Sequence, residues 1–260
     1  MKSTLVSLAV IMLLASGLLA QDEAKRHAVC EGEYSALFRD AKGDPKVVRV
    51  DHWRMNPMQD GSYSVDVELI PTAPTKAVRT EHHLLTKELK TKTFVSVMSN
   101  GVGSEIKIEC DYGTTELSCC YIHDGSSAAA TIRQEPPYVF WPSVEVPTLD
   151  LPWAFQAFVS QAVRTVGHKT AVPLVTLDEG QTRNSISLKV QEIEQVEYLG
   201  RETVEILGQK LLAHKFRLVD PETGAEQEFW VSESGLLLSM KMGEGRVISL
   251  TQYQGPSLAP

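Results

Sequence analysis

Residues 60–69 read Asp-Gly-Ser-Tyr-Ser-Val-Asp-Val-Glu-Leu, and this stretch decides the fold class. Its apolar residues, Tyr63, Val65, Val67 and Leu69, alternate with polar ones, so successive side chains point to opposite faces of an extended strand. The preceding Asp60-Gly61 pair suits a tight hairpin turn, because both residue types tolerate a positive φ. The stretch therefore predicts a half-buried antiparallel strand that follows a turn.

The same two-residue period recurs along the chain. It is found in Ile106, Ile108 and Cys110, in Leu212, His214, Phe216 and Leu218, and in Leu236, Leu238, Met240 and Met242. Turn sequences such as Asn100-Gly101 and Asp124-Gly125 separate these runs, and the last strands recur about every dozen residues, as in antiparallel sheets and barrels. We therefore predict a mainly β protein with a large antiparallel open or half β-barrel.

One segment departs from this period. Residues Pro152–Val163 have the spacing of an amphipathic helix, with Asp150 as a possible N-cap and Pro152 in the first turn. We expect this single helix to pack against the curved sheet. The predicted organisation is an N-terminal antiparallel β region over 26–135, a Pro-rich linker and aromatic helix over 136–168, and a C-terminal β meander over 169–260 that continues the first sheet.

The N-terminus has the layout of a secretory signal peptide. Lys2 precedes an apolar run from Leu5 to Leu14, and small residues lead to Ala20 before the polar Gln21. We predict cleavage after Ala20, which makes 1–20 the signal peptide, with cleavage after Gly17 as the alternative. The apolar segment is shorter than the roughly 20 residues of a membrane-spanning helix. The sequence thus predicts an exported protein, periplasmic or secreted, that does not span a membrane after cleavage.

The net charge of the chain restricts its possible binding partners, and its cysteine content indicates disulfides. The chain has 25 basic and 33 acidic residues, a net charge of −8, which argues against nucleic acid as a partner. Four cysteines in an exported chain favour disulfides. We expect Cys110 to bond to Cys119 or Cys120, and Cys30 to take the other of these two. An alternative turn at Tyr112-Gly113 would place Cys110 too far from Cys119 to bond.

Part of the C-terminal half resembles a known family. The run Tyr198–Lys210, followed by Ala213-His214-Lys215-Phe216 and by Phe229–Leu237, is similar to part of an uncharacterised bacterial periplasmic family, a domain of unknown function. The resemblance covers residues 198–242. It implies an open half-barrel wrapped around a helix, akin in shape to the proteins that carry lipoproteins between bacterial membranes. No catalytic residues can be transferred from the resemblance, because the family has none agreed upon and the matching motifs specify turns rather than chemistry.

Histidines and cysteines are the candidates for metal binding or catalysis. His82 and His83 lack the spacing of a zinc-binding helix, and neighbours on a strand point to opposite faces, so we expect a solvated strand end or turn. Cys119, Cys120 and His123 are close enough in sequence to hold Zn²⁺ or Cu(I), but disulfide formation competes in an oxidising compartment. We therefore predict no metal and no cofactor. A metal-dependent or other hydrolase remains an alternative that would depend on these residues.

Aromatic residues cluster around the predicted helix. They are Tyr138, Phe140, Trp141, Trp153, Phe155 and Phe158. These side chains either fill the core of the barrel or line a groove between sheet and helix that binds a lipid or another hydrophobic ligand. The sequence leaves both interpretations open. The second predicts a ligand-binding envelope protein, and its alternative is an interaction platform for another envelope protein.

Overall fold

The structure is a computed structural model, and it describes residues 30–39, 43–73, 78–87, 90–99, 105–133, 139–141, 164–179, 186–219, 226–242 and 245–258. The predicted signal peptide of residues 1–20 and the helix predicted over Pro152–Val163 lie outside these residues. The described residues form strands and turns. Among them, no helix has the length and apolar character needed to cross a membrane.

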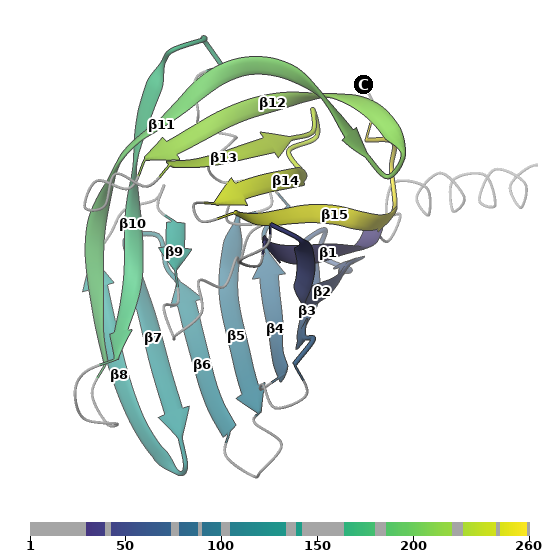
Figure 1. Ribbon diagram of the computed structural model, residues 1–260. Helices are drawn as coiled ribbons and strands as arrows, with labels where there is room; N and C mark the ends of the chain where they lie inside the picture. The colour runs from purple at the N-terminus through teal and green to yellow at the C-terminus, as the bar shows by residue number, and fades with distance from the viewer. Residues whose placement is uncertain are drawn as a thin grey trace, which may run out of the picture.

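Fifteen strands form a single sheet, in the order β8-β7-β6-β5-β4-β3-β2-β1-β15-β14-β13-β12-β11-β10-β9 (Figure 1). They are β1 Cys30–Arg39, β2 Pro45–Pro57, β3 Tyr63–Pro71, β4 Val78–Leu85, β5 Thr91–Ser99, β6 Glu105–Tyr112, β7 Glu116–His123, β8 Ser126–Arg133, β9 Val139–Trp141, β10 Lys169–Glu179, β11 Ile186–Ile206, β12 Gln209–Val219, β13 Glu226–Val231, β14 Leu237–Met242 and β15 Arg246–Gln254. The predicted mainly β, antiparallel open sheet is confirmed. It has one parallel pair, β9 with β10, which the two-residue period could not reveal.

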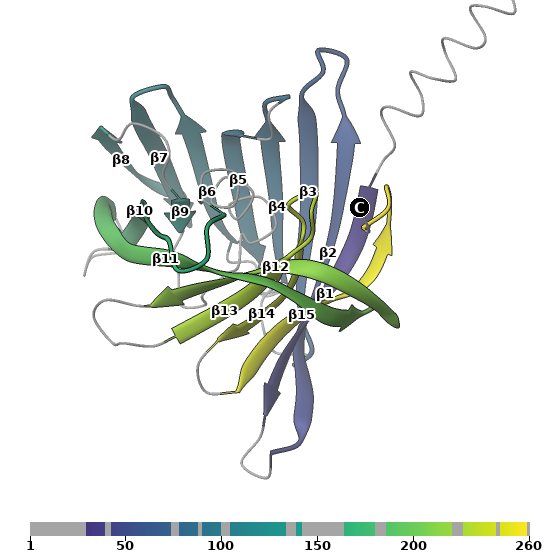
Figure 2. The same cartoon turned by 90° about the horizontal axis from the view of Figure 1, so that it is seen from above.

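The sheet folds over on itself. Seen from above, β2–β8 form one wall and β11–β14 the other, with β1 and β15 at the fold between them (Figure 2). At this fold the first and last strands pair antiparallel, with Glu31 opposite Gln254. On the far side, β8 contacts β11 without forming a strand pair with it. The described strands therefore form an open, barrel-like sheet. Its two walls are joined by the hydrogen-bonded β1–β15 pair, and no strand pairing joins β8 to β11.

Side chains of both walls meet between them in two buried clusters. The larger cluster joins β1–β4 to β11–β15, and its fully buried members include Val65, Leu85, Phe216, Phe229 and Met240. The smaller cluster lies on β5–β7 around Phe94 and Ile108, with Leu188 of β11 packed against it. The predicted apolar face of β3 agrees with this arrangement, because Val65 and Leu69 are buried. Leu212 differs from its predicted face, since it is exposed.

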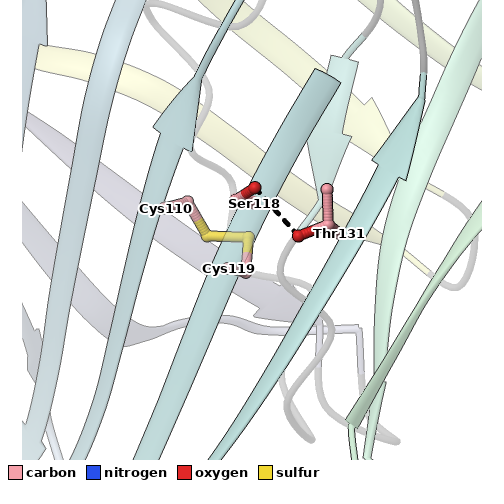
Figure 3. Close-up of a disulfide and its surroundings, with 4 residues drawn as sticks. All are labelled: Cys110, Ser118, Cys119 and Thr131. Carbon is pink, nitrogen blue, oxygen red and sulfur yellow. Dashed lines mark hydrogen bonds between the residues drawn. A yellow bond between two sulfur atoms is a disulfide. The ribbon is translucent and has the colours of Figure 1, made fainter.

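A disulfide joins Cys110 of β6 to Cys119 of β7 (Figure 3). The two residues are directly opposite in the antiparallel register, with Cα atoms 4.2 Å apart. The strands continue to the pair Tyr112 and Leu117, so the connection is longer than a turn at Tyr112-Gly113. The looped hairpin therefore brings the two sulfurs together inside the smaller cluster. The prediction that Cys110 bonds to Cys119 or Cys120 is confirmed, and the partner is Cys119.

Candidate functional site

A hollow of about 800 Å³ lies on the outer face of the sheet, across β15, β1, β2, β3, β4 and β5. We call it the outer trough. Its floor is the backbone around residues such as Trp53, whose indole points into the interior and is buried. The side chains that line the trough belong to the neighbouring positions, which face the opposite way because strand side chains alternate. The trough is therefore separated from the buried clusters by the thickness of the sheet.

Two rows of opposed residues cross the trough from strand to strand. The first row is Gln252, Glu33, His52, Glu68, Thr80 and Val97, and the second is Gln254, Glu31, Arg54, Asp66, His82 and Val95. Each residue of a row is the direct register partner of the next, so adjacent members are about 5 Å apart. Six strands at about 4.8 Å spacing give the trough a length of about 24 Å.

Gly32 allows the floor of the trough to form. This glycine lies between Glu31 and Glu33 and is opposite Trp53 in the register. A Cβ atom at position 32 would lie 2.8 Å from the Trp53 ring and 2.7 Å from the carbonyl oxygen of Gln252. The indole thus occupies the space that a side chain would need. Without a side chain here, β1 can pack tightly between β15 and β2, with Glu31 and Glu33 directed into the trough.

Most charged groups of the trough are paired across strands. Arg54 donates to Glu31 at 2.6 and 2.8 Å, and Nδ1 of His82 lies 2.7 Å from Asp66. The carboxylate of Glu33 accepts from Gln252 at 3.0 Å and has Nδ1 of His52 at 3.4 Å. These contacts order the side chains along the two rows.

Glu68 is different, because within the described residues its carboxylate has no hydrogen bond or ion pair. It is exposed and lies opposite His52 on one side and Thr80 on the other. Four carboxylates (Glu31, Glu33, Asp66 and Glu68) face one permanent cation, Arg54, along the two rows. The difference of 4 − 1 leaves three negative charges in excess while the imidazoles are neutral. The trough is therefore acidic, with its most available carboxylate near the middle.

A cluster of charged side chains lies on the inner face, behind the trough. Arg49 holds both oxygens of Asp51, at 2.6 and 2.7 Å. On β4, Nε of Arg79 contacts Glu81 at 2.7 Å, and Nε2 of His83 lies 3.3 Å from Glu81. Burial raises the pKa of Asp51, although Arg49 acts in the opposite direction. These groups are largely buried and pair with one another, so they stabilise one arrangement of the inner face.

A second buried chain of polar groups connects β11, β12 and the turn after β13. The hydroxyl of Tyr198 lies 2.9 Å from Nδ1 of His214, and Nε2 of His214 lies 2.9 Å from Glu233. Nε2 is also 3.1 Å from Arg164, but it cannot accept from Arg164 while it donates to Glu233. An ionised carboxylate can only accept, so the 2.9 Å contact with Glu233 requires the hydrogen on Nε2. The two-residue period places His214 on the same strand face as Phe216 and Leu218, and all three side chains are buried.

The two adjacent histidines point to opposite faces of β4. His82 lies in the outer trough and His83 is buried among the inner charges, so the two cannot share one ion. Of the predicted solvated strand end or turn, the position was wrong, since both residues lie within β4, and the solvation holds for His82 but not for buried His83. The alternation of Arg79, Glu81 and His83 with exposed residues, in phase with buried Leu85, was a signal that these charges face inward.

The candidate metal ligands after the disulfide are also separated. Cys119 is in the disulfide, while Cys120 lies on the outer face of β7 and His123 contacts Asp124 at 3.3 Å. Across the described part of the chain, no three His, Cys, Asp or Glu side chains are arranged to hold a metal ion. Cys30 and Cys120 are free thiols, so the predicted second disulfide was wrong. Cys30 is on β1 and Cys120 on β7, which are separated by five strands of the sheet order.

The described part of the structure does not test the predicted hydrophobic groove. The backbone of Phe140 and Trp141 forms part of β9, next to β10 at the edge of the sheet. Trp153, Phe155 and Phe158 lie outside the described residues, as do the side chains of Phe140 and Trp141. The groove stays a prediction.

Comparisons with known proteins show a similarity to a solved structure. No family model matches the chain, and no curated protein matches it. Among solved structures, the chain is similar to a β-barrel-like protein of the domain of unknown function DUF1849 from Brucella abortus. The TM-score is 0.49 and the sequence identity 9%, over 89% of this chain and 99% of that chain. The name of that protein gives a fold and states no ligand, partner or activity.

Proposed function

We propose that this protein is an exported envelope component that binds another envelope protein through the outer trough. The N-terminal signal pattern supports export. The observation that carries the binding role is the position of the trough: a hollow of about 800 Å³ opens outward, while the inner faces of the walls are occupied by buried apolar and ion-paired side chains. The sheet is then a rigid platform, and its outer face is the binding surface.

Site-specific photo-crosslinking tests this proposal. The full chain, with its own N-terminus, would be produced with a photo-crosslinking amino acid at Thr80 or at Val95 in the trough. The control position is Thr203, which is exposed on β11 and outside the trough. We expect the same single envelope protein to be crosslinked from Thr80 and from Val95 but not from Thr203. Equal labelling from all three positions, or labelling from none, would overturn the proposal.

A hydrophobic ligand in a groove formed by Phe140, Trp141, Trp153, Phe155 and Phe158 is the competing hypothesis. Native mass spectrometry of protein purified gently from the envelope separates the two. A lipid that co-purifies in fixed stoichiometry, with no crosslink in the trough, supports the hydrophobic-ligand hypothesis. An unliganded mass that lipids do not change, with crosslinks in the trough, supports the platform.

A further inference from the structure

We infer that the occupant of the outer trough is an extended segment of a partner protein that carries basic side chains at every third position. This inference rests on the proposed function and specifies the chemistry of the partner. Its basis is the order of charges along the two rows, which repeats with the spacing of the strands.

The carboxylates form two separate columns. Glu31 and Glu33 stand on β1, and Asp66 and Glu68 stand on β3, with β2 between them. Two strand spacings separate the columns, which corresponds to about 10 Å. A cationic ligand that meets both columns therefore needs two positive groups about 10 Å apart.

The length of the trough favours a chain over a small molecule. An extended segment of about eight residues spans the trough length of about 24 Å at about 3.1 Å per residue. In the polyproline II conformation, every third side chain returns to the same face, about 9.3 Å further along. Basic residues at every third position thus match the separation of the two acidic columns.

The two columns differ in how many of their carboxylates already have a side-chain partner within the trough. Arg54 already contacts Glu31, and Gln252 and His52 lie next to Glu33. On β3, Asp66 has His82 and Asn56 as its neighbours, while Glu68 is exposed beside His52 and Thr80. A basic side chain of the partner can approach Glu68 without first displacing an ion pair. The β3 column is therefore the anchor and the β1 column the second contact.

Fluorescence anisotropy with a defined peptide tests this inference. The probe is a labelled, amidated nine-residue peptide in which Lys-Pro-Pro occurs three times, and its control has acetyl-lysine in place of lysine. Exposed ion pairs change affinity by a factor on the order of five or less each. We therefore expect the Asp66→Asn/Glu68→Gln double variant to weaken binding about tenfold. The matched control, Glu205→Gln, removes an exposed carboxylate of β11 and should leave the affinity unchanged.

The outcomes separate this inference from the proposed function. Binding of the acetyl-lysine peptide as tightly as the lysine peptide, or equal affinity of the double variant and the wild type, would overturn the basic segment. Absence of peptide binding to the wild type would also overturn it. If crosslinking from Thr80 and Val95 still captures one envelope protein in those cases, the platform stands with a partner of different chemistry. If that crosslinking fails as well, the proposed function fails.

Discussion

The hydroxyl of Tyr198 lies 2.9 Å from Nδ1 of His214, across β11 and β12, and both side chains are buried. Through Nε2, the same imidazole binds Glu233, which lies in the turn between β13 and β14. One histidine therefore connects the longest strand of the sheet to a turn two strands away. This series of hydrogen bonds lies among the residues of the larger buried cluster, so within the described residues it does not reach the trough.

We predict that Tyr198→Phe lowers the free energy of unfolding. The change keeps the ring but leaves Nδ1 of the buried His214 without its partner, which costs about 1–3 kcal/mol. Urea unfolding monitored by tryptophan fluorescence measures the effect. The control is Tyr63→Phe, because the described residues include no hydrogen bond to the Tyr63 hydroxyl. Similar unfolding midpoints for wild type and Tyr198→Phe would contradict the prediction.

The pH dependence of stability should reveal the Glu233 contact. The hydrogen bond from His214 lowers the pKa of Glu233, and the charges of Arg201 and Arg164 act in the same direction. A lowered pKa in the folded state stabilises the fold above the unfolded value of about 4.3, and this contribution is lost as the pH falls through the folded value. Glu233→Gln should therefore be less stable than wild type at pH 7.

Unfolding measured at pH 7, pH 4.5 and pH 3 tests this linkage. The difference between wild type and Glu233→Gln should shrink as the pH falls. Glu205→Gln, which removes an exposed carboxylate, should show no comparable difference. A difference for Glu233→Gln that stays constant over the three pH values would refute the role of ionised Glu233.

We predict strong coupling between Arg49 and Asp51. Both side chains are largely buried and form two hydrogen bonds, so removing one partner leaves an uncompensated charge. Arg49→Met and Asp51→Leu should each cost about 3 kcal/mol, while the double variant should cost clearly less than their sum. A double-mutant cycle from denaturant unfolding gives the coupling energy. Additive effects within about 0.5 kcal/mol would mean that the pair is not coupled.

The disulfide should stabilise the smaller buried cluster. Replacing both Cys110 and Cys119 by serine should lower the free energy of unfolding by about 2–3 kcal/mol, because the bond closes a short loop in the unfolded chain. The Cys120→Ser variant is the control, since Cys120 is a free thiol that directly follows Cys119 in the sequence. N-ethylmaleimide added to the denatured, unreduced protein should label two cysteines. Absence of labelling would instead indicate a second disulfide.

Local structure was readable in the sequence where one face of a strand is apolar. Val65 and Leu69 are buried as their alternation predicts, and Cys110 meets Cys119 across a hairpin. The inner charges were missed because Arg79, Glu81 and His83 look like surface residues by type, and only their phase relative to Leu85 shows their side. The free-energy cost of burying these charges is reduced because each carboxylate has a cationic or hydrogen-bonding partner.

The outer trough could not have been found in this way. Its two rows combine β15 with β1–β5, and Glu33 is the direct register partner of Gln252 from the other end of the chain. Alternation tells which residues share a face of one strand, but it carries no information about which distant strand lies beside it. Glu68 was therefore visible only as a polar residue of an alternating run.

The sequence by itself determined that the chain forms strands, where they turn and which side of most strands is apolar, because these properties depend on residues close together along the chain. Only the tertiary structure decided that β1 pairs with β15 and that the sheet folds over. It also decided that the four carboxylates of the two rows and two histidines line one hollow. These features depend on pairing between the two ends of the chain, which is selected by packing of the whole sheet.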